Sequence, residues 1–156
     1  MPRSRQLLGL FGWILLSLAA SITGVFVSTQ GWYAALAKPA WNPPSWLFGP
    51  VWTTLYVAMG ISAWLVWRQG GWSQQRGRLA LFLVQWALNA LWTPLFFGLH
   101  QLGLAAAEIV VLWVAIAATL ASFARVSRIA AVLLVPYLGW VSFASVLTFT
   151  IWRMNA

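Results

Sequence analysis

Five apolar runs, each long enough to cross a bilayer, constrain the fold of this chain more than any other feature. A hydrocarbon core about 30 Å thick requires roughly 20 apolar residues in helical form. The runs that meet this requirement cover residues 7–27, 45–67, 79–99, 104–124 and 129–151. Of the 156 residues, 62% are hydrophobic and only 6% are charged. The pattern therefore predicts one all-α domain over residues 1–156, an integral membrane bundle of five transmembrane helices.

The nine basic residues stand singly or in pairs at the ends of the apolar runs. Because they form no patch, we expect no nucleic-acid partner. With five helices, one membrane face holds Arg3, Arg5, Arg68, Arg76, Arg78, Arg125 and Arg128, and the other holds Lys38 and Arg153. Cationic loops stay in the cytoplasm. This asymmetry predicts a cytoplasmic N-terminus, with the first loop and the C-terminus on the extracytoplasmic side of the membrane.

The inventory of reactive side chains excludes most enzyme chemistry. The chain has no cysteine, one histidine and one acidic residue. These cannot build a thiolate or histidine metal cluster, a catalytic triad or a carboxylate pair. We therefore expect no metal and no required cofactor. Any function must come from aromatic rings, amides, hydroxyls and shape, and 13 tryptophans are available for it.

The first loop, residues 28–44, is aromatic and rich in proline, as is the start of the second run. Residues 32–56 contain four of the seven prolines and the only lysine, among several tryptophans. A simple linker would be flexible and polar. Each proline instead fixes its own φ and disfavours helix at the preceding residue. The composition predicts a stiff lid over something that the helices enclose.

Four of the five runs carry a polar or aromatic stripe, because side chains three or four positions apart share a helix face. The stripes are Gln85, Asn89, Trp92 and Phe96; Tyr137, Trp140, Ala144 and Thr148; Trp52, Tyr56, Met59 and Ala63; and Ser17, Ser21, Gly24 and Ser28. Unpaired polar groups are costly in lipid, so the stripes should face inward. Two interpretations fit them. The amides and hydroxyls could join helices, at roughly 0.6 kcal/mol per contact. Alternatively, Trp52, Trp92 and Trp140 wall a cavity, with Gln85 and Asn89 at its floor.

Breaks between and within the runs are also predicted. Residues 68–78 are polar and contain glycine, which indicates a loop. Pro94 and Pro136 should interrupt their helices and free backbone carbonyls. Such kinks are tolerated in membrane helices, so they do not by themselves indicate a site.

Glu108, the only acidic residue, lies about one turn into the fourth run. A carboxylate at membrane depth is by default a functional candidate, and here it could serve a proton-coupled exporter of drugs. The other interpretation is an interfacial residue paired with Lys38 or His100, which belong to the same membrane face.

Three motifs resemble those of the translocator protein family, also called tryptophan-rich sensory proteins or peripheral-type benzodiazepine receptors. The resemblance covers nearly the whole chain. The motifs are Trp32-Tyr33-x-x-Leu36-x-Lys38-Pro39-x-Trp41-x-Pro43-Pro44 with Trp52-x-x-Leu55-Tyr56, Gln85-x-x-x-Asn89-x-x-Trp92-x-x-x-Phe96-Phe97, and Pro136-Tyr137-Leu138-x-Trp140-x-x-Phe143-Ala144 with Ile151-Trp152-Arg153-x-Asn155.

The resemblance implies a five-helix bundle, often a homodimer, with a ligand pocket under the first loop. Family ligands include porphyrins such as protoporphyrin IX, haem, sterols and synthetic isoquinoline carboxamides. The pocket positions implied here are Trp32, Tyr33, Pro43, Trp52, Asn89, Trp92, Trp140 and Ala144. Gln85 joins this ligand-binding set from the stripe alone.

The expected function is a membrane receptor or transporter-like protein that binds porphyrins and similar hydrophobic ligands in a regulatory or transport role. The sterol pattern of the animal members is incomplete, because Phe149 stands where they have tyrosine. We therefore favour a tetrapyrrole ligand and a bacterial cell membrane. One alternative is a light- and oxygen-dependent porphyrin-degrading enzyme that relies on Trp52 and Trp140. Another is a structural or partner-regulating membrane protein with an incidental pocket.

Overall fold

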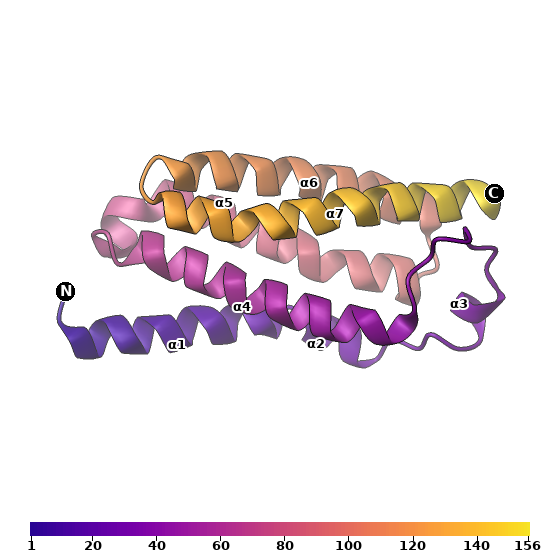
Figure 1. Cartoon of the computed structure of the whole chain (residues 1–156), viewed down its shortest axis with the longest axis horizontal. Helices are drawn as coiled ribbons and strands as arrows, with labels where there is room; N and C mark the ends of the chain where they lie inside the picture. Colours follow the sequence, from indigo (N-terminus) through magenta and orange to yellow (C-terminus); the bar gives the residue numbers. More distant parts are fainter.

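The computed structural model describes all 156 residues and consists of five long helical rods lying side by side, with the termini at opposite ends (Figure 1). The first rod is α1 Arg3–Ala19 with α2 Ile22–Val25, the second is η1 Ser45–Leu47 with α4 Phe48–Trp67, and the third is α5 Gly71–Thr93 with η2 Pro94–Gly98. The fourth rod is α6 Leu102–Ala124, and the fifth is α7 Arg128–Met154. A single helical turn, α3 Trp32–Ala35, lies in the first loop. Each of the five rods is long and apolar enough to cross a membrane. This confirms the predicted all-α membrane bundle.

The start of α5 shows that the loop predicted at residues 68–78 was wrong. The helix begins at Gly71, so only residues 68–70 connect it to α4, and a kink at Gln75, where φ is −110° and ψ is 17°, separates its first turn from the rest. Gly70 and Gly71 make the turn with φ of 109° and 72°, a left-handed backbone that glycine adopts without strain. The polar side chains that suggested a loop bind backbone instead. Gln75 Nε2 donates to the Gln69 carbonyl at 2.7 Å, and Arg78 Nε donates to a carbonyl of α6 at 3.2 Å.

The two helix prolines behave differently. Pro94 opens η2, a π-helical segment in which the Leu99 N–H donates to the Pro94 carbonyl at 2.8 Å. Pro136 was expected to interrupt its helix, but α7 continues through it. Its ring is exposed, while Leu134 and Tyr137 on either side are buried against other helices. Packing therefore holds the helix together where proline removes one backbone hydrogen bond.

The stripes predicted to face inward do so on three rods. Tyr56 on α4, Asn89 on α5 and Tyr137 on α7 are all buried. On the first rod only Ser17 is buried, and the other three members of its stripe are exposed. The reason is a break in the helix at residues 20 and 21, which changes the direction of the face beyond it.

Side chains on α1 and α4 bind the backbone of the facing helix. Ser17 Oγ donates to the Tyr56 carbonyl at 2.6 Å, and Trp64 Nε1 donates to the Gln6 carbonyl at 2.8 Å. Close approach of the two backbones is possible because Gly60 has no side chain where it meets α1. Small residues and polar side chains of this kind associate helices in lipid, where no hydrophobic effect acts between them.

The first loop is an ordered part of the fold. Lys38 Nζ donates to three carbonyls between residues 33 and 36, at 2.8, 3.2 and 3.0 Å. Asn155, just beyond α7, fixes Ala37 by accepting its N–H at 3.0 Å and donating to its carbonyl at 2.8 Å. Tyr33 packs with Phe96 in a small apolar cluster at the end of the bundle, separate from the main core. The loop is thus attached to both η2 and the C-terminal end of α7.

Gly60→Ala should destabilise the protein, because a Cβ at this position would lie 2.6 Å from Ile14 Cα. Backbone of α1 must then move away, which costs about 1–3 kcal/mol for an overpacked core. Thermal unfolding of the purified protein in detergent would measure the loss. Gly139→Ala is the matched control, since no atom lies within 4 Å of the position that its new methyl group would take. Equal melting temperatures for the two variants would contradict this account of the α1–α4 contact.

Candidate functional site

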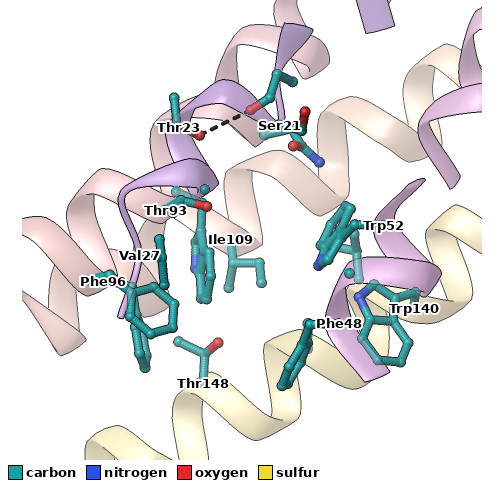
Figure 2. A pocket seen from close by; sticks show the side chains of 18 of the residues that line it. Ser21, Thr23, Val27, Phe48, Trp52, Thr93, Phe96, Ile109, Trp140 and Thr148 are labelled. Atoms are coloured by element: carbon teal, nitrogen blue, oxygen red, sulfur yellow. Dashed lines mark hydrogen bonds between the residues drawn. The ribbon is translucent and has the colours of Figure 1, made fainter. Parts of the chain in front are cut away.

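One cavity of about 420 Å³ lies among α2, α4, α5, α6 and α7, toward the end of the bundle that carries the first loop (Figure 2). No charged residue lines it. Ser21 and Gly24 from the first rod and Gly49 and Thr53 from α4 line the cavity and are also exposed. The cavity therefore opens between these two rods.

Aromatic rings form its walls. Trp52 and Trp140 stand on one side, and Phe96 stands across from them (Figure 2). The Trp52 ring stacks on Tyr56, with centroids 5.5 Å apart, and the Trp140 ring meets the edge of Phe48 at 6.0 Å. On the opposite wall Trp92, which also lines the cavity, stacks on Phe96 at 4.9 Å. These contacts hold the indole rings in place, so each presents a fixed surface to the cavity.

A chain of neutral hydrogen bonds lies at the polar end of the cavity. The Tyr56 hydroxyl donates to Asn89 Oδ1 at 2.6 Å, and Asn89 Nδ2 donates to the Tyr137 hydroxyl at 2.9 Å. The Tyr137 hydroxyl in turn donates to Gln85 Oε1 at 2.7 Å. The four side chains join α4, α5 and α7. Asn89 lines the cavity, whereas Gln85 lies beyond it. The amides were expected either to join helices or to form the floor of a cavity. Gln85 only joins helices, whereas Asn89 joins helices and also reaches the cavity.

Two indole N–H groups in the cavity wall have no partner within the protein. Trp92 Nε1 and Trp140 Nε1 are both buried and unpaired. Buried donors normally have an acceptor, because an unpaired one costs free energy comparable to a lost hydrogen bond. The cavity therefore offers fixed aromatic faces and two buried, unpaired indole donors in a wall without charged residues.

The structure brings six of the nine predicted site residues to this cavity. The residues that line it are Tyr33, Trp52, Asn89, Trp92, Trp140 and Ala144. Tyr33 is the only one of them that comes from the lid, where its ring contacts Phe96 and Phe97. The lid thus reaches the cavity mainly through the ring of Tyr33, with Thr29 at its start.

The other three predicted residues do not line the cavity. Trp32 stacks on His100 with centroids 3.9 Å apart, and its ring meets the edge of Phe96 at 5.7 Å. Pro43 accepts a hydrogen bond from Asn42 within the loop at 3.3 Å. The side chain of Gln85 forms a hydrogen bond only with the hydroxyl of Tyr137. Of the three, Trp32 supports the cavity wall through its contact with Phe96.

One wall was predicted only in part, because Ser21 and Gly24 of the first stripe line the cavity but the residues around them were not expected there. The segment after the break in the first rod supplies lining residues, among them Thr23, Val27 and Thr29. At the break, the hydroxyls of Ser21 and Thr23 donate to the carbonyls of Leu18 and Ala20 at 2.6 and 3.0 Å. The second of these bonds is the dashed line beside Thr23 in Figure 2. The signal was present as a run of serine, threonine and glycine at residues 21–29 inside an apolar span. Such side chains compete with helical hydrogen bonds.

The interpretation of Glu108 as an interfacial residue paired with Lys38 or His100 is wrong. Glu108 pairs with neither of them. Its carboxyl group is buried on α6, and neither oxygen has a hydrogen-bond partner. Lys38 is bound to the carbonyls of its own loop, and His100 is stacked on Trp32. Glu108 does not line the cavity, although its neighbour Ile109 does.

Tyr137→Phe should lower stability, since the Tyr137 hydroxyl is the only partner of the Gln85 side chain. Leaving buried polar groups unpaired costs about 1–3 kcal/mol, and thermal unfolding in detergent would report it. Tyr33→Phe is the control, because its hydroxyl only accepts a weak 3.5 Å bond from Asn42. If the two variants unfold alike, the hydrogen-bond chain does not hold the three helices together.

The comparisons with known proteins agree with this architecture. Residues 12–153 match the TspO/MBR family. The chain is 44% identical to the translocator protein of Homo sapiens over 143 residues, which cover 89% of this chain and 85% of the human protein. It is 42% identical to the tryptophan-rich protein TspO of Archaeoglobus fulgidus over 154 residues, or 97% and 99% of the two chains. It is also 42% identical to protein CrtK of Rhodobacter capsulatus over 140 residues, or 87% and 86%. A match over nearly the whole length, on a bundle of five membrane-length helices, shows that this chain is an integral membrane protein of the TspO/MBR family.

Proposed function

We propose that the cavity binds a flat aromatic macrocycle of the porphyrin class and that the protein acts as a membrane receptor or transporter for it. The observation that carries the proposal is that Trp52, Trp92 and Trp140 all line one uncharged cavity. Indole faces stack on flat conjugated ligands. The volume of about 420 Å³ falls within the range of about 300–1,000 Å³ for small-molecule sites.

The donors of the cavity suit the edge of such a ligand. The unpaired N–H groups of Trp92 and Trp140 would bind acceptor atoms on its periphery, such as carboxylate or carbonyl oxygens. Asn89 adds an amide that is already oriented by Tyr56 and Tyr137. Because the cavity opens between the first rod and α4, a macrocycle could extend past its walls toward the lipid.

The names of the relatives favour a role in movement or signalling of the ligand. The human relative is called a translocator protein, and a relative from Cereibacter sphaeroides is called a tryptophan-rich sensory protein. The cavity needs no cofactor to bind its ligand, and porphyrin or haem would be the ligand itself. By resemblance to the family, we also propose that the protein assembles as a homodimer.

The proposed orientation puts the N-terminus in the cytoplasm of a bacterial cell. Seven of the nine cations lie at the end of the bundle that holds the N-terminus, and only Lys38 and Arg153 lie at the other. This distribution follows the rule that short basic segments stay inside. The cavity and its lid would then lie toward the extracytoplasmic side.

Titration of the detergent-solubilised protein with protoporphyrin IX, followed by porphyrin absorbance, tests the proposed binding. Saturable binding is expected, and Trp140→Leu should weaken it about tenfold, equivalent to about 1.4 kcal/mol, because one stacking face and one donor are lost. Trp46→Leu is the matched control, since Trp46 is 72% exposed and does not line the cavity. Binding that does not saturate, or equal affinity in both variants, would show that porphyrin merely partitions into the detergent.

Light-driven degradation of the porphyrin is a second candidate function, favoured by Trp52 and Trp140 lying in the same cavity. A photoexcited macrocycle bound there could take an electron from either indole, with dissolved oxygen as the terminal oxidant. Under illumination in air the parent should bleach protoporphyrin IX faster than Trp52→Phe and Trp140→Phe do, and Trp46→Phe should match the parent. Spectra recorded over time would measure the rates. Equal bleaching by all four proteins would eliminate the enzyme and leave the receptor intact.

A further inference from the structure

A second, shallower depression lies outside the ligand cavity, on the surface where α1 and α4 meet. This groove has a volume of about 230 Å³ and is lined by Gly9, Gly12, Trp13, Leu16 and Trp67. All five are apolar or lack a side chain. The groove lies near the N-terminal end of the bundle, because α1 begins there and α4 ends there (Figure 1).

Two glycines shape the groove in different ways. A Cβ on Gly9 would lie 2.2 Å from the Trp67 ring, so the missing side chain lets this indole lie against the backbone of α1. At Gly12 no atom lies within 4 Å of a Cβ position, and the space above it is open. The packing of α1 against α4 therefore explains why Gly9 has no side chain, but it does not explain why Gly12 has none. What fills the space over Gly12 must come from outside the chain.

One cationic group, that of Arg5, stands at the end of the groove, and a second, that of Arg68, lies over a neighbouring ring of α4. Arg5 shares the face of α1 that carries Gly9 and Gly12, because the spacings are four and seven residues. Its guanidinium lies 5.9 Å from the centre of the Trp67 ring. The guanidinium of Arg68 lies 4.9 Å from the centre of the neighbouring Trp64 ring.

Neither arginine has an anionic partner within the protein. The only acidic side chain of the chain, Glu108, is buried near the start of α6. That position and the C-terminal carboxylate are both at the opposite end of the bundle (Figure 1). At the depth where these arginines leave the apolar region, the available anions are the phosphates of lipid headgroups.

From these features we infer that the groove is a binding site for one anionic phospholipid. An acyl chain lies over Gly12 between Trp13, Leu16 and Trp67, and the headgroup phosphate contacts the guanidinium of Arg5. Arginine suits this role because its planar donors match phosphate oxygens. A second copy of the chain is a poorer occupant, because it would bring two sets of arginines together without an acid to separate them.

Lipid retention tests this site on the full-length protein. The protein is exchanged into an uncharged detergent with equal amounts of phosphatidylglycerol and phosphatidylcholine, and bound lipid is counted by native mass spectrometry. The parent should retain phosphatidylglycerol about fivefold over phosphatidylcholine, as expected for one cation near a phosphate. Gly12→Leu, which fills the groove, and Arg5→Gln, which removes the charge, should each bring this ratio close to one.

Two matched variants serve as controls and should keep the parent ratio. Gly139→Leu adds the same side chain at an exposed glycine of α7 that also has no atom within 4 Å. Arg128→Gln removes an exposed cation at the same membrane face but away from the groove. No lipid preference in the parent, or equal ratios in all four variants, would overturn the site. A shift from dimer to monomer in Gly12→Leu with an unchanged ratio would assign the groove to a second copy instead.

Discussion

The hydrogen bonds that link Tyr56, Asn89, Tyr137 and Gln85 are the interaction on which the rest of the structure depends. In hydrocarbon an unpaired polar group costs several kcal/mol, so each of these side chains must find a partner inside the bundle. The partners lie on α4, α5 and α7, and the hydroxyl of Tyr137 serves two of them. Satisfying these groups fixes how the three helices are rotated relative to one another. The indoles one turn away are then fixed with them.

This arrangement determines what the cavity can offer to a ligand. The amide of Asn89 and the hydroxyl of Tyr56 are already hydrogen-bonded within the protein, and the wall carries no charge. The cavity offers a ligand aromatic surface, the N–H groups of Trp92 and Trp140, and a few serine and threonine hydroxyls. A site with these properties can hold a large conjugated ligand in place, but it cannot transfer a proton to it. These properties support the proposed binding of a conjugated ligand, and in the proposed degradation the chemistry would come from light and oxygen acting on that ligand.

The span lengths and inward faces could be predicted from sequence because both follow from the cost of polar groups in lipid. The apolar run at residues 45–67 forms one membrane-length rod, and the polar side chain of Asn89 faces inward, away from lipid. The start of α5 could not be predicted in the same way. Gln75 and Arg78 look like loop residues, and only the folded chain supplies the carbonyls that bind them. Likewise, Trp32 carries the expected motif, but its stacking on His100 is a tertiary contact that no helical spacing encodes.

A shortage of acids connects the orientation of the protein with its surface chemistry. Nine cations share a chain with one acidic residue, so pairing within the protein cannot neutralise them. Lys38 and Arg78 are stabilised by backbone carbonyls instead. Arg5 and Arg68 lie over indoles, which attract cations but do not cancel their charge. The anions that balance them must belong to the membrane, and they are concentrated on its cytoplasmic leaflet. The imbalance behind the proposed orientation therefore also underlies the proposed lipid site at the N-terminal end of the bundle.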